Sequence, residues 1–198
     1  MTPPIYFARH GQTEWNAIER FQGQAEADLT PLGRSQAAAN GALLKRLVAD
    51  PSAYAFVASP MRRTRETMEI ARAAMGLDPK AYLLEPRLIE VNFGDWQGYT
   101  ADELERSRPG LLALRDKDKW NYVPSGAGAE SYAVLARRVA GWLDRFSGPA
   151  VVVTHGGVIR SLFHIVNKLP DVEAATMDVP QDRVLSLSEG RLEWISPE

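Results

Sequence analysis

The stretch that most limits the possible folds is residues 150–153, Ala-Val-Val-Val, a continuous apolar run with no polar alternation. β-branched residues favour strands. A strand that is apolar on both faces is typical of the centre of a parallel sheet whose two faces are both covered. The run therefore predicts a central strand with helices packed on either side.

The rest of the chain alternates between patterns typical of strands and of helices. Further strands are predicted at residues 5–8, 54–58 and 81–84, and a terminal hairpin at 184–187 and 192–195. Helices are predicted at about 31–48, 59–75, 131–146 and 157–168. The alternation predicts one domain over residues 1–198, a three-layer α/β/α fold with a mainly parallel central sheet. Residues 100–128 carry two weak helical patterns and are expected to form a lid-like segment.

Composition excludes several classes of function. The net charge of -2 and the pI near 6.0 argue against a general nucleic-acid partner. No apolar run approaches the roughly 20 residues of a membrane span, and the first residues lack the pattern of a secretory signal. The chain has no cysteine, so thiolate nucleophiles and disulfides are excluded. We expect a cytoplasmic protein; the sequence is compatible with either a monomer or a dimer.

Two histidines follow predicted strands directly. His10 comes after the strand at 5–8 and His155 after the strand at 150–153, and each is followed by a glycine. In open α/β sheets, ligands bind at the carboxyl ends of the strands, and glycine permits close approach of a ligand. This shared placement favours a functional role for both. The third histidine, His164, lies in the middle of a predicted helix and is expected to be an ordinary helix residue.

Charged residues also follow predicted strands, at the same carboxyl ends as the two histidines. Arg9 precedes His10, and Arg62 and Arg63 follow the predicted strand at 54–58. Arginine offers a planar fork of donors that suits phosphate oxygens. Glu90 also follows a predicted strand, and its apolar neighbours would keep water from the carboxyl group, which suits a proton donor.

Five ordered motifs carry a resemblance to a known family that covers nearly the whole chain. They are Arg9-His10-Gly11-Gln12-Thr13-Glu14-Trp15-Asn16; Phe21-Gln22-Gly23 with Leu29-Thr30-Pro31-Leu32-Gly33; Ser59-Pro60-Met61-Arg62-Arg63-Thr64 with Thr67; Leu88-Ile89-Glu90 with Phe93-Gly94 and Gly98; and Thr154-His155-Gly156-Gly157. Together they resemble the histidine phosphatase superfamily, also called the phosphoglycerate mutase-like family. The resemblance implies a phosphoglycerate mutase-like fold and, here, a phosphatase.

The resemblance also implies roles for individual residues. It implies that His10 is the nucleophile and becomes phosphohistidine, and that Glu90 is the general acid. The implied phosphoryl ligands are Arg9, Arg63, His155, Asn16 and the backbone N–H of Gly156, with Thr13 and Gly23 as further substrate-binding positions inside the matched motifs. Two departures are Thr64, where the family often has alanine, and residues 124–131, which replace a Pro-Gly-Gly-Glu-Ser-like stretch.

The chemistry of these side chains agrees with the implied roles. Phosphoryl transfer requires mainly positioning and electrostatic stabilisation, which two guanidiniums and a second imidazole can supply. The set lacks the carboxylate cluster of a magnesium or two-metal site. We therefore expect neither a metal nor another cofactor, and a small phosphate ester as the partner.

Two alternatives to a phosphatase remain. A cofactor-dependent phosphoglycerate mutase would use the same residues, but the mutases that this chain resembles are longer after the acid motif and need an enclosing lid with extra cations. Lys117 and Lys119 could touch an acidic substrate, although a solvated helix face is the expected place for both. A non-catalytic phospho-ligand binding or regulatory domain is opposed by the presence of every reactive residue.

Overall fold

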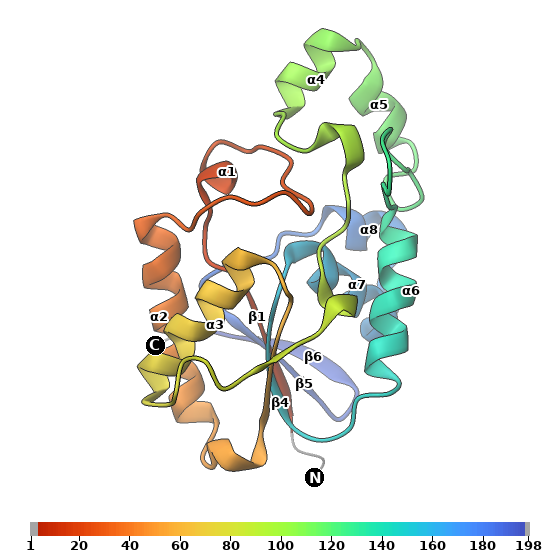
Figure 1. Cartoon of the computed structure of the whole chain (residues 1–198). Coiled ribbons are helices and arrows are strands. Elements are labelled where there is room, and N and C mark those ends of the chain that lie inside the picture. The colour runs from red at the N-terminus through yellow and green to blue at the C-terminus, as the bar shows by residue number, and fades with distance from the viewer. Residues whose placement is uncertain (1–3, 197–198) are drawn as a thin grey trace.

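The computed structural model describes residues 4–196, and its centre is a six-stranded sheet (Figure 1). The strands are β1 (Ile5–Arg9), β2 (Ala55–Ala58), β3 (Leu83–Leu84), β4 (Ala150–Thr154), β5 (Val184–Ser188) and β6 (Arg191–Ile195). Their order is β3-β2-β4-β1-β5-β6. The first four pair in parallel, and β5 runs antiparallel to both β1 and β6. The predicted mainly parallel sheet, with the valine run at its centre, is confirmed.

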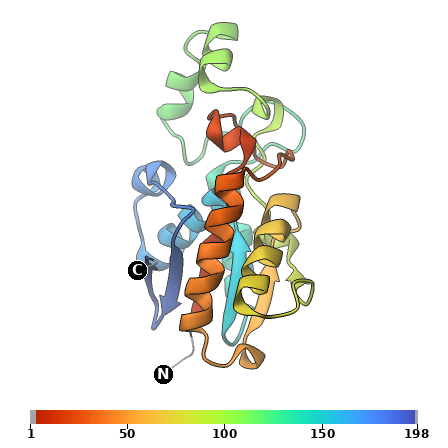
Figure 2. The ribbon, with the colours of Figure 1, turned by 90° about the vertical axis from the view of Figure 1, so that its left-hand side faces the viewer.

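Helices cover both faces of this sheet. They are α1 (Glu14–Ala17), α2 (Pro31–Leu47), α3 (Arg62–Met75), α4 (Ala101–Ser107), α5 (Leu111–Asp116), α6 (Tyr132–Leu143), α7 (Gly156–Asn167) and α8 (Asp171–Thr176), with single 3-10 turns at Pro51–Ala53, Pro86–Leu88 and Gly94–Trp96. α2 and α3 lie on one face, as Figure 2 shows from their side, and α6 and α7 lie on the other (Figures 1 and 2). Within residues 4–196, none of the helices has the length and apolar character needed to cross a bilayer.

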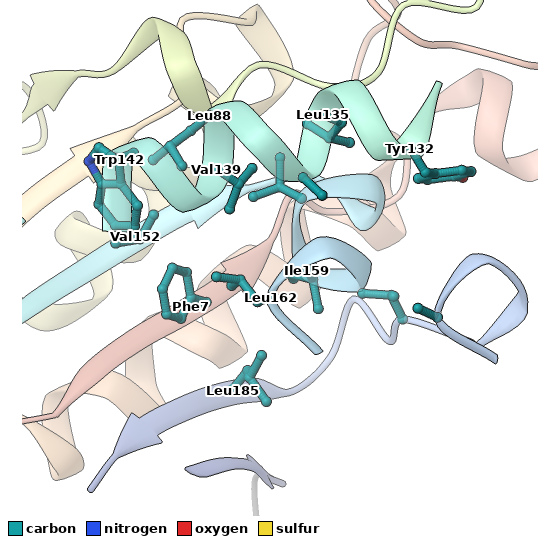
Figure 3. Packing of buried hydrophobic residues seen from close by; sticks show 14 of the residues in the cluster. Phe7, Leu88, Tyr132, Leu135, Val139, Trp142, Val152, Ile159, Leu162 and Leu185 are labelled. Carbon is teal, nitrogen blue, oxygen red and sulfur yellow. The ribbon is translucent and has the colours of Figure 1, made fainter. Parts of the chain in front are cut away.

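The two faces of each inner strand belong to two separate cores. On β1, Phe7 packs toward α6 and α7, while Tyr6 and Ala8 join the cluster under α2 and α3. Figure 3 shows the first core, where Phe7 meets the ring of Trp142 edge-on at 6.2 Å between centroids. Successive side chains of a strand point to opposite faces, so β4 can be apolar throughout only because helices cover both sides.

Local chemistry sets the helix ends where the sequence predicts them. Thr30 accepts a hydrogen bond from Gly33 N at the start of α2, and Pro31 occupies the first turn. Gly76 ends α3 with a left-handed φ of 81°. These residues fix where α2 begins and where α3 ends.

Three predicted elements differ from the structure by more than one residue, and two helices were not predicted. α3 begins at Arg62 rather than at residue 59, with Met61 as its N-cap. The third strand spans two residues, not 81–84, because it is an edge strand with both leucines exposed and only β2 to pair with. α6 ends at Leu143 rather than at residue 146. α1 and α8 were not predicted, since helices of four and six residues are too short to show a periodicity.

The segment 100–128 extends past the carboxyl ends of the parallel strands (Figures 1 and 2). It carries α4 and α5, which matches the two weak helical patterns. Arg20 holds its beginning through a bidentate ion pair with Glu103, with N–O distances of 2.8 and 3.1 Å. The segment is therefore attached to the loop that follows α1.

Candidate active site

A cavity of about 270 Å³ lies at the carboxyl ends of β1 and β4, and it is bounded on another side by the segment 100–128. Seven of the nine predicted site residues line it: Arg9, His10, Asn16, Gly23, Arg63, Glu90 and Gly156. Parallel strands bring their carboxyl ends to one edge of the sheet. Residues separated by up to 147 positions in the chain, from Arg9 to Gly156, thus meet in one place.

His10 is buried and its ring has a defined tautomer. Its Nδ1 lies 2.8 Å from the carbonyl oxygen of Gly11, which can only accept, so Nδ1 carries the proton. Nε2 keeps its lone pair, and Arg63 Nε donates to it at 3.3 Å. Burial, followed by the charges of Arg63 and Arg9, lowers the pKa of His10 well below the usual 6.5. The imidazole is therefore neutral at physiological pH and presents a nitrogen nucleophile.

Arg63, and not Arg62, lies beside His10. The guanidinium of Arg63 is 1% exposed and donates to the carbonyls of Gly23 (2.6 Å) and Ala25 (3.0 Å). Burial lowers the pKa of Arg63 to about 10, so it stays charged. Arg62 points to the surface, where it pairs with Asp28. Adjacent helix positions are about 100° apart, which explains why only one of the two reaches the cavity.

Three buried nitrogens around the cavity have no hydrogen-bond partner in the described chain. They belong to Arg9 (Nε), Gln22 (Nε2) and His155 (Nδ1). Buried donors without partners are rare and costly. His155 is fully buried behind the cavity lining, 5.3 Å from His10 between ring centroids, and its Nε2 bonds Ser59 Oγ at 2.7 Å. Arg9 Nε and Gln22 Nε2 always carry hydrogens, and His155 Nδ1 carries one when its Nε2 accepts from the Ser59 hydroxyl. In that tautomer all three nitrogens are donors that a small anion can satisfy.

Glu90 is held by main-chain donors. Its two carboxylate oxygens accept from Val91 N at 2.9 Å and from Gly157 N, at the start of α7, at 3.0 Å. A side chain at Gly157 would place Cβ 2.2 Å from Glu90 Oε1, so only glycine fits there. Arg138 NH2 donates to the Glu90 carbonyl at 2.9 Å. The carboxylate therefore has a fixed position at the edge of the cavity.

The other predicted binding residues have distinct places. Asn16 Oδ1 accepts from Thr13 N and from Gln181 Nε2, so its amide nitrogen is its free donor. Thr13 is fully buried, does not line the cavity and caps α1. Gly23 has a left-handed φ of 52°, and a Cβ there would lie 2.4 Å from Gln97 Oε1. Its carbonyl oxygen serves to anchor Arg63.

Three cations of the cavity were not predicted as site residues. They are Arg115 in the last turn of α5, Lys119 in the turn that follows α5, and Arg160, one turn into α7. The expectation that Lys119 lies on a solvated face is wrong, because its side chain is half-buried and lines the cavity. Burial, then the charges of Arg115 and Arg160, lowers the pKa of Lys119 to about 8. Lys117 is exposed, as expected. No helical periodicity marked Lys119, because it lies in a turn beyond the end of α5.

The arrangement suits nucleophilic attack on an anion. A neutral imidazole nitrogen lies among fixed positive charges, and one carboxylate stands at the edge of the same cavity. Such a site stabilises negative charge in a transition state without reorganisation. Among residues 4–196, no three His, Cys, Asp or Glu side chains are grouped so as to hold a metal ion.

The chain belongs to the histidine phosphatase superfamily (branch 1), whose family model matches residues 5–194. It is 34% identical over 178 residues to the glucosyl-3-phosphoglycerate phosphatase of Mycobacterium tuberculosis, covering 84% of this chain and 76% of that protein. It is 33% identical over 172 residues to a probable phosphoglycerate mutase of Erwinia tasmaniensis, covering 84% and 75%. A solved mycobacterial glucosyl-3-phosphoglycerate phosphatase in complex with VO3 superposes with a TM-score of 0.77 at 29% identity, covering 98% and 96%.

Stability should decrease as the pH falls below about 6.5. Burial lowers the pKa of both His10 and His155 well below 6.5, with Arg63 next in effect. Below that pH the unfolded chain binds more protons than the native state, so each imidazole removes up to about 1.4 kcal/mol of unfolding free energy per pH unit, until the folded pKa is reached.

Urea unfolding at pH 7.5 and 5.5 measures this loss, and His10→Asn is the comparison. The variant has no titrating group at this position. The decrease in its free energy of unfolding between pH 7.5 and pH 5.5 should therefore be about 1.4 kcal/mol smaller than the decrease in the unsubstituted protein. An equal loss of unfolding free energy in both proteins would mean that folding does not lower the pKa of His10.

Proposed function

We propose that the protein is a phosphomonoesterase that hydrolyses a small phosphorylated metabolite through a phosphohistidine on His10, without a metal ion. The observation that carries the proposal is the neutral His10 Nε2, 3.3 Å from Arg63 Nε at one end of a cationic cavity. The similarity to glucosyl-3-phosphoglycerate phosphatases supports the reaction and a small phosphorylated metabolite as the substrate class.

In the first step, His10 Nε2 attacks phosphorus and the bond from phosphorus to the ester oxygen breaks. The leaving oxygen takes its proton from the carboxylic acid form of Glu90. The hydrogen bond from Nδ1 to the Gly11 carbonyl stabilises the positive charge that develops on the ring. Donors for the three phosphoryl oxygens are Arg9, Arg63, Asn16, His155 and the Gly156 N–H.

In the second step, water attacks the phosphohistidine. Glu90, now a carboxylate, accepts a proton from this water, and the bond from phosphorus to Nε2 breaks. Inorganic phosphate leaves, and both His10 and Glu90 return to their starting protonation states. The unpartnered nitrogens of Arg9 and Gln22 support this assignment, because a phosphoryl group accepts hydrogen bonds on every oxygen. His155 Nδ1 adds a third donor in the tautomer whose Nε2 accepts from Ser59.

A phosphoglycerate mutase is the second candidate, and one observation favours it. A mutase must hold a bisphosphorylated intermediate, and Arg115, Lys119 and Arg160 provide cations that the sequence argument against it did not anticipate. The segment 100–128, which we propose as a lid, contributes two of these cations, Arg115 and Lys119, to the cavity lining.

Phosphate release with EDTA present tests the proposal. We expect hydrolysis of p-nitrophenyl phosphate and of 3-phosphoglycerate with stoichiometric inorganic phosphate, and no requirement for a bisphosphoglycerate primer. Loss of activity in EDTA that returns on adding a divalent metal would contradict the metal-free mechanism. Interconversion of 2- and 3-phosphoglycerate with little phosphate released would establish the mutase.

Glu90→Gln should slow esters of poorly acidic alcohols far more than aryl esters. General acid catalysis contributes about 10²–10⁴-fold, and a phenolate leaves without needing a proton. We expect a loss in this range for glycerol 3-phosphate and a much smaller loss for p-nitrophenyl phosphate. For both esters the quantity measured is the rate constant for release of the alcohol or phenol in single turnovers. The same loss for both esters would assign Glu90 a purely structural role.

A further inference from the structure

The tautomer of His155 depends on a single contact. Burial, then the charge of Arg63, lowers the pKa of His155 well below 6.5, so the ring is neutral and carries one proton, on either Nδ1 or Nε2. Nε2 lies 2.7 Å from Ser59 Oγ. Nδ1 has no hydrogen-bond partner in the part of the chain that the structure describes, and it does not cap α7, although His155 is the N-cap residue. The serine therefore decides whether Nδ1 is a donor or an acceptor.

The main chain around Ser59 holds its hydroxyl beside the imidazole. Ser59 directly follows β2, and its N–H donates to the carbonyl of Val153 on β4 at 3.0 Å. Its own carbonyl accepts from Thr64 Oγ1 at 2.8 Å. Because β2 and β4 are paired in parallel and β4 leads into His155, the two side chains start from neighbouring strand ends. The sheet itself thus places the serine against Nε2.

Hydrogen-bond accounting gives the direction of the contact between Ser59 and His155. Both side chains are fully buried, and within residues 4–196 the serine hydroxyl bonds no atom other than His155 Nε2. If Nε2 carried the ring proton, the hydroxyl would have no acceptor and Nδ1 would be a lone pair without a donor. Buried polar groups without partners are costly. If the hydroxyl donates to Nε2, its proton is satisfied and only Nδ1–H is left for a ligand.

A phosphoryl group beside His10 requires this tautomer. The rings of His10 and His155 are 5.3 Å apart between centroids, so a group attached to His10 Nε2 lies close to the second imidazole. The oxygens of a phosphoryl dianion accept hydrogen bonds and cannot donate them. A lone pair on Nδ1 would repel these oxygens, whereas Nδ1–H binds one of them without any proton transfer beforehand.

We infer that Ser59 is a positioning residue: its hydroxyl donates to His155 Nε2 and keeps the ring in the tautomer whose Nδ1–H binds the phosphoryl group. The inference rests on the proposed function, since it names the residue that prepares the second imidazole of the same site. Thr64 provides the matched comparison. Its buried hydroxyl donates to the carbonyls of Ser59 and Met61 in the same turn and makes no hydrogen bond to His155.

NMR of the protein labelled with ¹⁵N-histidine reads the tautomer directly, in phosphate-free buffer at pH 7.5. The chain has three histidines, and spectra of His10→Asn and His164→Asn assign the signals of His155. We expect a protonated Nδ1 and an unprotonated Nε2 in the unsubstituted protein and in Thr64→Ala, and a shift of the proton toward Nε2 in Ser59→Ala. A protonated Nε2 in the unsubstituted protein would overturn the inference, and this result does not depend on the folding of any Ser59 variant. An unchanged tautomer in a folded Ser59→Ala protein would overturn it as well.

Calorimetric titration with inorganic phosphate measures the consequence for binding without any turnover. Ser59→Ala should weaken the Kd of phosphate by about tenfold, the size expected when a hydrogen bond to a charged group is lost, while Thr64→Ala should keep it within about twofold. Thermal unfolding of both variants controls for folding. Unchanged phosphate affinity in Ser59→Ala, or the same weakening in Thr64→Ala, would overturn the inference. Hydrolysis of p-nitrophenyl phosphate by the unsubstituted protein, measured in parallel, reports on the proposed function separately.

Discussion

His10→Ala should reduce turnover by about 10⁶-fold, the size of loss found when a hydrolase loses its nucleophile. Nε2 is the ring nitrogen that keeps a lone pair for attack, because Nδ1 carries the proton and donates a hydrogen bond to the Gly11 carbonyl. The measurement is kcat for p-nitrophenyl phosphate, with thermal unfolding of the variant as the control for folding.

Acid quenching would destroy the intermediate, because a phosphoramidate is labile in acid and stable in base. A labelled substrate should therefore be quenched in base, and peptide mass spectrometry should place the label on His10. Label on a serine instead, or near-normal turnover in a folded His10→Ala protein, would remove the phosphohistidine from the mechanism.

Arg63→Ala should cost roughly 2.7–4 kcal/mol of transition-state stabilisation, a loss of about 10²–10³-fold in kcat, as for a removed oxyanion donor. The guanidinium is aimed at His10 Nε2 and is fixed by the carbonyls of Gly23 and Ala25. Arg62→Ala is the matched control at the adjacent position, whose side chain pairs with Asp28 at the surface, and its kcat should stay within twofold.

Arg63→Lys separates charge from geometry. It keeps a positive charge but not the planar fork that reaches both carbonyls and His10, so we expect it to recover only part of the loss. Because Arg63 is buried, circular dichroism and thermal unfolding must accompany the kinetics of both variants. If Arg62→Ala were the slower of the two alanine variants, the assignment of Arg63 to the phosphoryl group would be wrong.

Much of the fold was predictable because it depends on patterns local in sequence. The valine run in β4 can be satisfied only at the centre of a sheet covered on both sides. Thr30 with Pro31, and Gly76 after α3, mark helix ends through their own capping chemistry. Short elements such as α1, α8 and the edge strand β3 have too few residues to show a periodic pattern of apolar side chains.

The candidate site was predictable where its residues follow strand ends. His10 and His155 each follow a strand of the same parallel group, so their proximity follows from the topology. Glu90 is different: it lies six residues past β3, and it is positioned by the N–H of Gly157 and by Arg138, contacts that only the tertiary structure reveals.

The sequence by itself determined that the sheet is mainly parallel with β4 as a central strand, which helices follow which strands, and the residues that meet at the carboxyl ends of β1 and β4. These features depend on strand burial and helix capping, which are set by neighbours along the chain. Only the tertiary structure decided which side chains of the segment 100–128 face the cavity. There the deciding contact is the burial of Trp120 against Tyr132 and His164, which brings Lys119 to the cavity while Lys117 stays in solvent. A helical pattern as weak as that of residues 100–128 does not specify which face is covered, because the packing partner is supplied by distant segments.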